Sequence, residues 1–221
     1  MKKAQEAGIF DIRFLDIRQF SDDPHRQVDH YPYGGKQGML LRTDILQRAI
    51  ESIDCFEEYR LIYTCPKGEL FSQGHADAFS KEKGLVLICG YYEGVDERLF
   101  SLFPIQRVSV GNVVLSSGEF PALLIAEAVL RLLPGVVGNE KSVRDDSLMN
   151  GLLEGPQYTA PREIAGFIVP EVLLSGHHAN VQRWQRKQAL RQTLYAKPEL
   201  LQTAILTHED QLSLVEILKE V

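Results

Sequence analysis

The sequence has no apolar stretch approaching the ~18 residues that a membrane-spanning helix needs, and its start, MKKAQEAGIF, carries no secretory apolar core. It has only three cysteines, Cys55, Cys65 and Cys89, without a C-x-x-C pair, as is typical of a reducing compartment. It also lacks a basic excess: the formal net charge is −6 and the pI is about 5.6, which argues against nucleic-acid binding by overall charge. We therefore expect a cytoplasmic protein without a membrane partner, in which RNA binding requires a local basic patch.

Several motifs that define common ligand sites are also missing. Neither G-x-G-x-x-G nor G-x-S-x-G occurs, which excludes a dinucleotide-binding fingerprint and a hydrolase nucleophile elbow. The glycine-rich stretch 32–39 contains Gly35 and Lys36 but is not a P-loop, because His30 replaces the first glycine and Gln37 replaces the Ser or Thr. The six histidines include no H-x-x-x-H pair, so we predict no metal site from spacing.

What the sequence does contain is an alternation of short apolar strands and amphipathic helices over 221 residues, of which 44% are hydrophobic and 24% charged. The apolar run 85–89, bounded by Gly84 and Gly90, is typical of a parallel strand covered on both faces. The alternation predicts an α/β fold with a mostly parallel sheet. The predicted strands are 11–17, 61–64, 85–89, 107–110 and 113–115, and the predicted helices are 44–53, 76–82 and 121–133.

The chain changes character at 138–157, which is polar, charged and rich in glycine. We interpret this stretch as a flexible linker or lid between two domains. The first domain, 1–137, carries the α/β pattern. The second, 158–221, is dominated by a long helix within 175–197 and a final amphipathic helix, which predicts a small helical domain.

Two glycine-bearing loops follow candidate strands, where open α/β sheets bind their ligands. The loop 89–98 follows the most apolar strand directly, and the loop 110–124 runs straight into a helix whose N-terminal amides can bind the polar edge of a ligand. Each loop can also be explained without a ligand. The charges of the loop 89–98 suit the start of a helix, and Glu119 in the loop 110–124 is favourable near a helix N-terminus for structural reasons alone.

Two clusters of charge also allow more than one interpretation. Asp145 and Asp146 are adjacent carboxylates, either in a solvated loop or in a site that uses one of them as a base. The segment 175–197 has no acidic residue, and its cations recur at helical spacing, which suits phosphate contacts or a plain solvated face. These cations are Arg183, Arg186, Lys187, Arg191 and Lys197.

The chain contains, in this order, YPYGGKQGM, CGYYEGVDER, SVGNVVLSSGEFPAL, RLLPGVVGN, DSLMNGLLEGPQYTAP and VPEVLLSGHHANVQRWQRKQAL. Together these segments cover nearly the whole chain and resemble the bacterial tRNA (guanine-N1)-methyltransferases of the knotted SPOUT superfamily. The resemblance implies an α/β domain with a deep trefoil knot that holds S-adenosylmethionine in a bent form, followed by a small helical tRNA-binding domain. It also implies a homodimer in which each active site is built from both subunits.

The resemblance further implies a reaction and the residues that perform it. The substrate is guanine at position 37 of tRNA, preceded by another guanine, and a magnesium ion is expected to be needed for activity. Asp146 matches the general base, Arg131 its electrostatic partner, and Arg183, Arg186, Lys187 and Arg191 the contacts to RNA phosphates. The residues that match the methyl-donor site are Tyr63, Thr64, Cys65, Pro66, Gly90, Glu93, Val110, Gly111, Asn112, Val113, Val114, Leu115, Ser117 and Gly118.

These roles agree with the chemistry of the residues. N1 of guanine bears a proton, so its lone pair is unavailable until a base removes that proton. An aspartate in a closed, partly dry loop is suited to this step, because burial raises its pKa toward the working range. Negative charge then develops on the guanine O6, where the guanidinium of Arg131 stabilises it.

The chain departs from the family pattern at several points. It starts inside the helix that follows the family's first strand, so we expect that strand to be missing from the sheet. Asn112 and Val113 replace an Asp-Tyr pair, and Ser117 replaces a glycine. Asn150 stands where an aspartate is common, and Lys36 interrupts a run of glycines. These departures motivate a second hypothesis, a catalytically impaired RNA-binding relative with the same fold.

Overall fold

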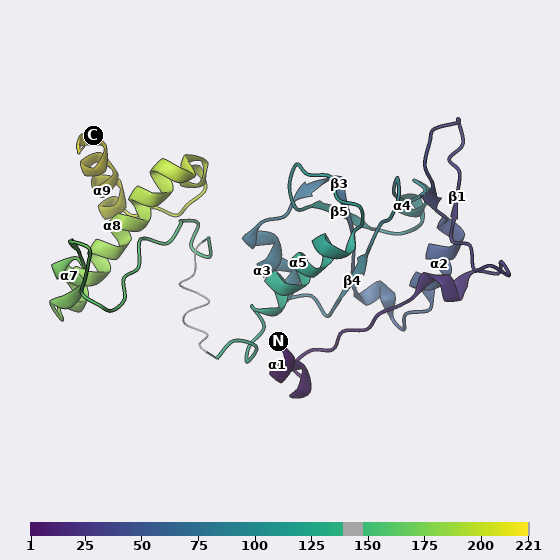
Figure 1. Ribbon diagram of the computed structural model, residues 1–221, viewed down its shortest axis with the longest axis horizontal. Helices are drawn as coiled ribbons and strands as arrows, with labels where there is room; N and C mark the ends of the chain where they lie inside the picture. Colours follow the sequence, from purple (N-terminus) through teal and green to yellow (C-terminus); the bar gives the residue numbers. More distant parts are fainter. Residues whose placement is uncertain (139–147, 221) are drawn as a thin grey trace. The chain divides into compact units, whose positions relative to one another are not determined.

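The computed structural model describes residues 1–138 and 148–220, and the chain forms two compact units, Met1–Gly138 and Asn139–Val221 (Figure 1). The first unit is built around a parallel sheet and the second around two helices. The elements of the first unit are α1 (Lys2–Glu6), η1 (Ile17–Phe20), β1 (Asp29–His30), β2 (Leu40–Leu41), α2 (Thr43–Glu51), η2 (Phe56–Glu58), β3 (Arg60–Leu70), α3 (Gln73–Ser80), β4 (Leu85–Ile88), α4 (Leu99–Leu102), β5 (Gln106–Ser109) and α5 (Glu119–Leu130).

The central sheet has the strand order β4-β3-β5, and all neighbouring strands run parallel. Tyr63 of β3 pairs with Ile88 of β4 on one side and with Arg107 of β5 on the other. The predicted α/β fold with a parallel sheet is therefore confirmed. β4 and the stretch 61–63 of β3 are apolar because helices cover both faces of the sheet there, so neither face needs polar residues.

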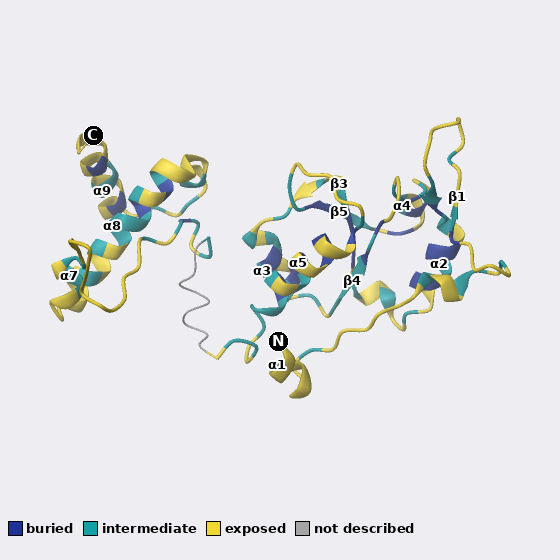
Figure 2. Cartoon of the chain, viewed as in Figure 1, coloured by how far each residue is buried: buried dark blue, intermediate teal, exposed yellow. Residues whose placement is uncertain are grey.

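The two faces of β3 pack against different helices, since successive side chains of a strand point to opposite sides. Leu61 and Tyr63 belong to a core cluster with residues of α2 and α4. Ile62 faces the other way and packs with Val108 of β5 and with apolar residues of α3 and α5. Ile62 and Ile125 of α5 are fully buried, which stabilises the unit by about 2 kcal/mol for each side chain. Figure 2 shows this burial along the strands and on the inner sides of the helices.

The strand β3 leaves the sheet and returns to it. Thr64 and Glu69 both pair with Val108, so the four residues between them bulge out of the pairing. A side chain at Gly68 would collide with the backbone of Val108, and glycine is therefore required where the bulge closes. The bulge places residues 65–68 at the carboxyl end of the sheet.

Two strand predictions are wrong. Residues 11–17 form no strand: η1 begins at Ile17, and Phe14 is 90% exposed. Residues 113–115 form a loop with Val114 89% exposed. In both cases the alternating or apolar pattern was present, but no neighbouring strand supplies the hydrogen bonds that make a strand.

The second unit contains the hairpin β6 (Glu163–Ile164) and β7 (Phe167–Ile168), the helices α7 (Glu171–Leu174), α8 (His178–Ala196) and α9 (His208–Lys219), and the short helix η3 (Pro198–Gln202). Its core contains Leu190 of α8 and Ile217 of α9, both fully buried. Leu152 joins the same core, and Thr193 accepts a hydrogen bond at its Oγ1 from the backbone N–H of Leu153 at 2.9 Å. Residues 148–157, which the sequence places in the linker, thus contribute to this unit. No helix in the described part of the chain is long and apolar enough to cross a membrane.

Candidate functional site

Three chain segments meet at the carboxyl end of the parallel sheet. They are the end of the first part of β3 at Thr64, the residue Gly90 after β4, and Gly118 before α5. The N–H of Gly118 donates to the carbonyl of Gly90 at 2.8 Å, and Thr64 Oγ1 donates to the carbonyl of Gly118 at 3.2 Å. Tyr91 and Ser117 pair as an antiparallel bridge beside this contact. The segments meet here because parallel strands place their following loops at the same edge.

The meeting point has no room for side chains. A Cβ at Gly118 would lie 2.6 Å from both the backbone N of Gly90 and Oγ1 of Thr64. A Cβ at Gly90 would lie 2.6 Å from the hydroxyl oxygen of Tyr63. Glycine is therefore required at position 118 by the close approach of the Gly90 backbone and at position 90 by the ring of Tyr63, and the sequence analysis placed both residues in the methyl-donor site.

The tyrosine and the thiol at the meeting point stay uncharged near neutral pH. Burial raises the pKa of Tyr63 to about 12. Burial, with a smaller contribution from the charge of Glu119, raises the pKa of the Cys89 thiol to about 11. Cys89 is therefore a neutral thiol and is unsuited to act as a nucleophile here. This part of the sheet edge offers backbone polar groups and apolar surface to a ligand.

The loop after β5 presents apolar side chains beside these backbone groups. Val113, Val114 and Leu115 are 54%, 89% and 46% exposed. The loop begins with a tight turn in which Ser109 Oγ accepts from the N–H of Gly111 at 3.2 Å and donates to its carbonyl at 3.0 Å. Exposed apolar side chains next to free backbone amides are suited to hold a flat, partly apolar ligand by its polar edge.

The residues predicted for the donor site are thus only partly brought together. Tyr63, Thr64, Gly90, Ser117 and Gly118 converge, as described above. The others lie on the two adjoining loops: Cys65 and Pro66 in the bulge of β3, and Val110, Gly111, Asn112, Val113, Val114 and Leu115 after β5.

Glu93 has a different environment, which the sequence did not indicate. Its backbone N–H donates to the carbonyl of Met39 at 3.1 Å, and its side chain lies where a Cβ on Gly38 would be. The glycine-rich stretch 32–39 and the loop 89–98 therefore contact each other. Glycine at position 38 was a signal of such an approach, but a single sequence does not tell which segment approaches.

Two further residues, Arg131 and Asp146, are expected to assist proton removal. Arg131 is half-buried at the C-terminal end of α5. Asp146 lies outside the described residues. Their roles therefore remain predictions.

The cations of α8 are paired with carboxylates of α9. Arg186 donates to both carboxylate oxygens of Asp210, at 2.9 and 3.0 Å, and this pair together with Thr207 holds the pKa of Asp210 at about 2. Because the Asp210 side chain is only 4% exposed, this pair belongs to the helix–helix contact. The remaining pairs are Arg183 with Glu209, Lys187 with Glu216 and Glu220, and Arg191 with Glu220.

This pairing changes the interpretation of α8 as a free basic face. The sequence showed no acidic residue within 175–197, yet α9 supplies the carboxylates from more than twenty positions further along the chain. Arg183 differs from the others, because it and Glu209 are 70% and 68% exposed. Such an exposed pair contributes little free energy, so a phosphate can replace Glu209 at Arg183.

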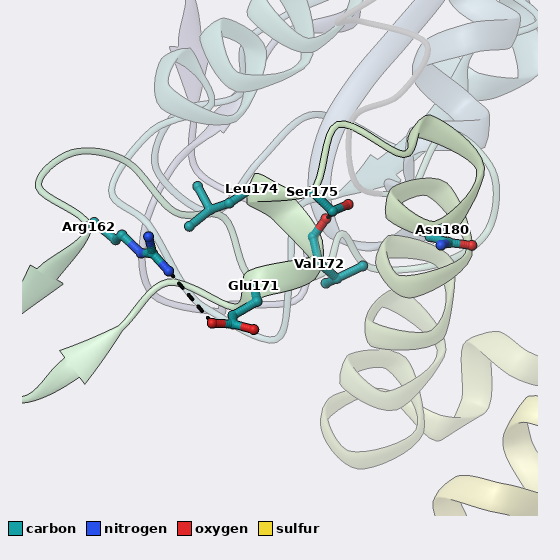
Figure 3. Close-up of a pocket in the computed structure, with 6 residues that line it drawn as sticks. All are labelled: Arg162, Glu171, Val172, Leu174, Ser175 and Asn180. Carbon is teal, nitrogen blue, oxygen red and sulfur yellow. Dashed lines mark hydrogen bonds and ion pairs between the residues drawn. The ribbon is translucent and has the colours of Figure 1, made fainter.

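A hollow of about 540 Å³ lies in the second unit, and none of the residues predicted for the site lines it (Figure 3). Figure 3 shows an ion pair at its edge, with Arg162 and Glu171 at 3.7 Å. Both side chains are well exposed, at 63% and 90%, so the hollow has no buried polar anchor. Among residues 1–138 and 148–220, no group of three or more His, Cys, Asp or Glu is placed to hold a metal ion.

Comparison with known proteins provides a family match over most of the chain. A family model described as tRNA (Guanine-1)-methyltransferase TrmD matches residues 1–203. A protein of Dictyoglomus turgidum named tRNA (guanine-N(1)-)-methyltransferase is 46% identical over 220 residues, which are 100% of this chain and 89% of that protein. Proteins of the same name from Staphylococcus aureus strains JH9 and N315 are 46% identical over 211 residues, which are 96% of this chain and 86% of theirs.

Proposed function

Because this chain belongs to the tRNA (guanine-N1)-methyltransferase family, we propose that it transfers a methyl group from S-adenosylmethionine to N1 of the guanine at position 37 of tRNA. The observation that carries the proposal is the meeting of Thr64, Gly90 and Gly118 at the carboxyl end of a parallel sheet. The close contact of the loops after β4 and β5 also supports a trefoil knot at this place. An impaired relative is not favoured, since relatives named for the activity match nearly the full length.

The residues around the meeting point fit the methyl donor. S-adenosylmethionine is flat and aromatic at one end, carries a positive sulfonium, and supplies an electrophilic methyl group when bound. The exposed apolar side chains Val113, Val114 and Leu115 suit its adenine ring, and the neighbouring backbone groups suit the polar edge of that ring. The substitutions Asn112 and Val113 are compatible with this mode, because backbone groups do the binding.

The proposed chemistry needs a base and an electrostatic partner. Asp146 removes the proton from N1 of guanine, and the N1 lone pair then forms the bond to the methyl carbon as the carbon–sulfur bond breaks. Arg131 stabilises the negative charge on O6 during this step. We also expect a magnesium ion to be needed for activity; among residues 1–138 and 148–220, no group of three or more His, Cys, Asp or Glu is placed to hold one.

The proposed substrate is a tRNA, held in part by α8. Arg183 is the cation of α8 most available to a phosphate, because its partner Glu209 is exposed. Arg186 acts mainly by holding α9, while Lys187 and Arg191 extend the cationic row. We expect the protein to work in the cytoplasm, where its RNA substrate is found.

We also propose that the enzyme is a homodimer whose active sites are shared between subunits. The outer face of α5 supports this: Phe120, Leu123 and Leu124 are 70%, 59% and 49% exposed. Exposed apolar side chains gathered on one helix, next to the proposed donor site, are typical of a protein–protein interface.

The experiment that tests the function is transfer of labelled methyl from S-adenosylmethionine to a tRNA transcript with guanines at positions 36 and 37. A second transcript with adenine at 37 is the control. We expect label in the first transcript and none in the second. Absence of label with folded protein that binds S-adenosylmethionine would contradict the proposal, and label in both transcripts would contradict the assigned position.

Replacing the proposed base tests the mechanism separately from binding. Asp146→Ala is expected to lower kcat by at least ~100-fold, since general-base catalysis contributes on that order, while the affinity for S-adenosylmethionine stays within a few-fold. Single-turnover methylation and calorimetric titration measure the two effects. Asp145→Ala is the matched control and is expected to keep most of the activity. If Asp146→Ala stays comparably active, another group removes the proton.

A further inference from the structure

Four exposed tyrosines lie on two loops that contact each other at Gly38 and Glu93. Tyr31 and Tyr33 are in the loop between β1 and β2 and are 71% and 94% exposed, while Tyr91 and Tyr92 follow Gly90 and are 46% and 51% exposed. Figure 1 shows the loop after β1 projecting from the first unit, and Figure 2 shows its exposure. We call these four side chains the aromatic platform.

The two halves of the aromatic platform are held together by the backbone. The N–H of Glu93 donates to the carbonyl of Met39, and the N–H of Leu41 donates to the carbonyl of Gly94 at 2.9 Å. Asp29 of β1 lies close enough to Tyr92 to raise the pKa of its hydroxyl. The base of the hairpin is thereby attached to the loop 89–98, so the loop that carries Tyr31 and Tyr33 starts from a defined position.

The platform is also continuous with the proposed donor site. Tyr91 directly follows Gly90 and pairs with Ser117, which precedes Gly118. Tyr91 is thus one residue from the point where the three segments meet. A nucleotide adjacent to the methylated guanine would come within reach of this surface.

The conformation of the loop exposes the rings. Tyr92 has φ +55°, a left-handed conformation that costs a bulky residue about 1–2 kcal/mol. The rings of Tyr91 and Tyr92 stand edge to face, with centroids 4.5 Å apart. Neither ring is in the core clusters, so the strained backbone does not serve to bury them.

The chemistry of the surface fits unpaired RNA bases. Aromatic side chains stack on splayed bases of RNA loops, and each stacked base contributes about 1–3 kcal/mol. Cations stand beside the rings: Lys36 is exposed in the same loop, and Arg98 is 73% exposed although it pairs with Asp96. Arg98 donates hydrogen bonds to the carboxylate of Asp96, which raise the pKa of its guanidinium, and Tyr33 adds a smaller electrostatic contribution. Cations beside exposed rings suit a ligand that presents both bases and phosphates.

We infer that Tyr31, Tyr33, Tyr91 and Tyr92 form a stacking platform for the unpaired bases that flank the methylated guanine in the anticodon loop. The inference rests on the proposed function, because it takes the RNA from that proposal. It adds a contact that determines how the RNA loop is held open beside the methyl donor. The other candidate occupant, a second copy of this chain, is distinguished by the test below.

The test uses the full chain and a tRNA transcript with guanines at 36 and 37 and the fluorescent base 2-aminopurine at position 38. The double variant Tyr31→Leu/Tyr33→Leu removes two rings but keeps apolar bulk, and Tyr31→Phe/Tyr33→Phe keeps the rings. Loss of one to two stacked bases is expected to raise the RNA Kd by about 10- to 100-fold in the leucine variant. The phenylalanine variant is expected to stay within two-fold of the unchanged protein, and 2-aminopurine emission is expected to respond to binding in all but the leucine variant.

Phe14→Leu is the matched control, because Phe14 is 90% exposed but lies away from the platform. Its neighbour Arg13 lies near Asp54 and Tyr59, which precede β3 at the other end of the sheet. It is expected to leave the RNA Kd unchanged, and affinity for S-adenosylmethionine is expected to be unchanged in every variant. Equal RNA binding by the leucine variant overturns the inference. Conversion of a dimer to a monomer in that variant, measured by light scattering, also overturns it and identifies a subunit interface. If the unchanged protein binds the RNA but transfers no methyl group, the proposed function fails while the titration still tests the platform.

Discussion

At the scale of single residues, the proposed donor site depends on two glycines, because their lack of a side chain lets the loops come together. Gly90 and Gly118 lie where the loops after β4 and β5 approach within hydrogen-bond distance, and a methyl group at either position would occupy space that is already filled. The sequence analysis placed both positions in the methyl-donor site. Neither glycine has a backbone conformation reserved for glycine, so here the requirement comes from packing.

Gly118→Ala is therefore expected to separate the two loops. The new Cβ would lie 2.6 Å from backbone N of Gly90, and backbone cannot move as cheaply as a side chain. We expect the affinity for S-adenosylmethionine to fall at least ~10-fold, an effect of about 1.4 kcal/mol, measured by calorimetric titration. Gly74→Ala is the control: its Cβ meets only Ser72 Oγ, at 3.6 Å, and alanine in the helix α3 stabilises by up to about 1 kcal/mol. Unaltered binding by Gly118→Ala would show that the loop contact does not shape the donor site.

At the scale of elements, α8 and α9 form a pair joined by charge as well as by apolar packing. Leu190 and Ile217 are buried between them, and the bidentate contact of Arg186 with Asp210 lies beside this core. Asp210 also accepts from the N–H of Thr207 at 2.8 Å and so completes the capping box of α9. One carboxylate thus starts the helix and attaches it to α8.

The stability of this helix pair is expected to fall in acid. The pKa of Asp210 is lowered from its ordinary value of 3.8 to about 2, so its contribution is present above about pH 4 and is lost as the pH falls toward 2. The shift corresponds to about 2 kcal/mol. Asp210→Asn should lose about that much at pH 7 and show a weaker pH dependence between 4 and 2.

The single tryptophan, Trp184, lies on α8 and reports unfolding of this unit by its fluorescence. Urea unfolding curves at several pH values therefore measure the effect. Glu209→Gln is the matched control, since its partner Arg183 is exposed and the pair is worth less than about 1 kcal/mol. Equal losses in the two variants would contradict a structural role for Asp210.

At the scale of the whole molecule, an active site shared between subunits predicts that two variants damaged in different parts of the site restore activity when they are mixed. If the donor site of one subunit works with Asp146 of its partner, Asp146→Ala and Gly118→Ala damage different halves of each site. Mixing the two variants should then raise the activity above that of either variant alone, up to about a quarter of the unchanged level when subunits exchange randomly. Methyl transfer before and after mixing measures this.

The control for the mixing experiment is a variant that cannot dimerise. Leu123→Glu places a charge on the exposed apolar face of α5 and is expected to give a monomer by light scattering. A mixture of Asp146→Ala with the double variant Gly118→Ala/Leu123→Glu should stay inactive. Activity in that mixture, or no gain of activity on mixing Asp146→Ala with Gly118→Ala, would contradict an active site shared through the apolar face of α5.

The sequence alone indicated the parallel α/β class, the strands at 61–64, 85–89 and 107–110, the helices at 44–53, 76–82 and 121–133 to within a few residues, and the family, because apolar periodicity and short motifs are local or ordered properties of the chain. It did not determine that 11–17 and 113–115 form no strand, since a strand exists only where a neighbour pairs with it. Only the tertiary structure decided that Gly118 touches Gly90, that α9 covers the cations of α8, and that the tyrosines adjoin the donor site. Each of these contacts joins residues far apart in the sequence, and sequence patterns do not give the spatial distance between such residues.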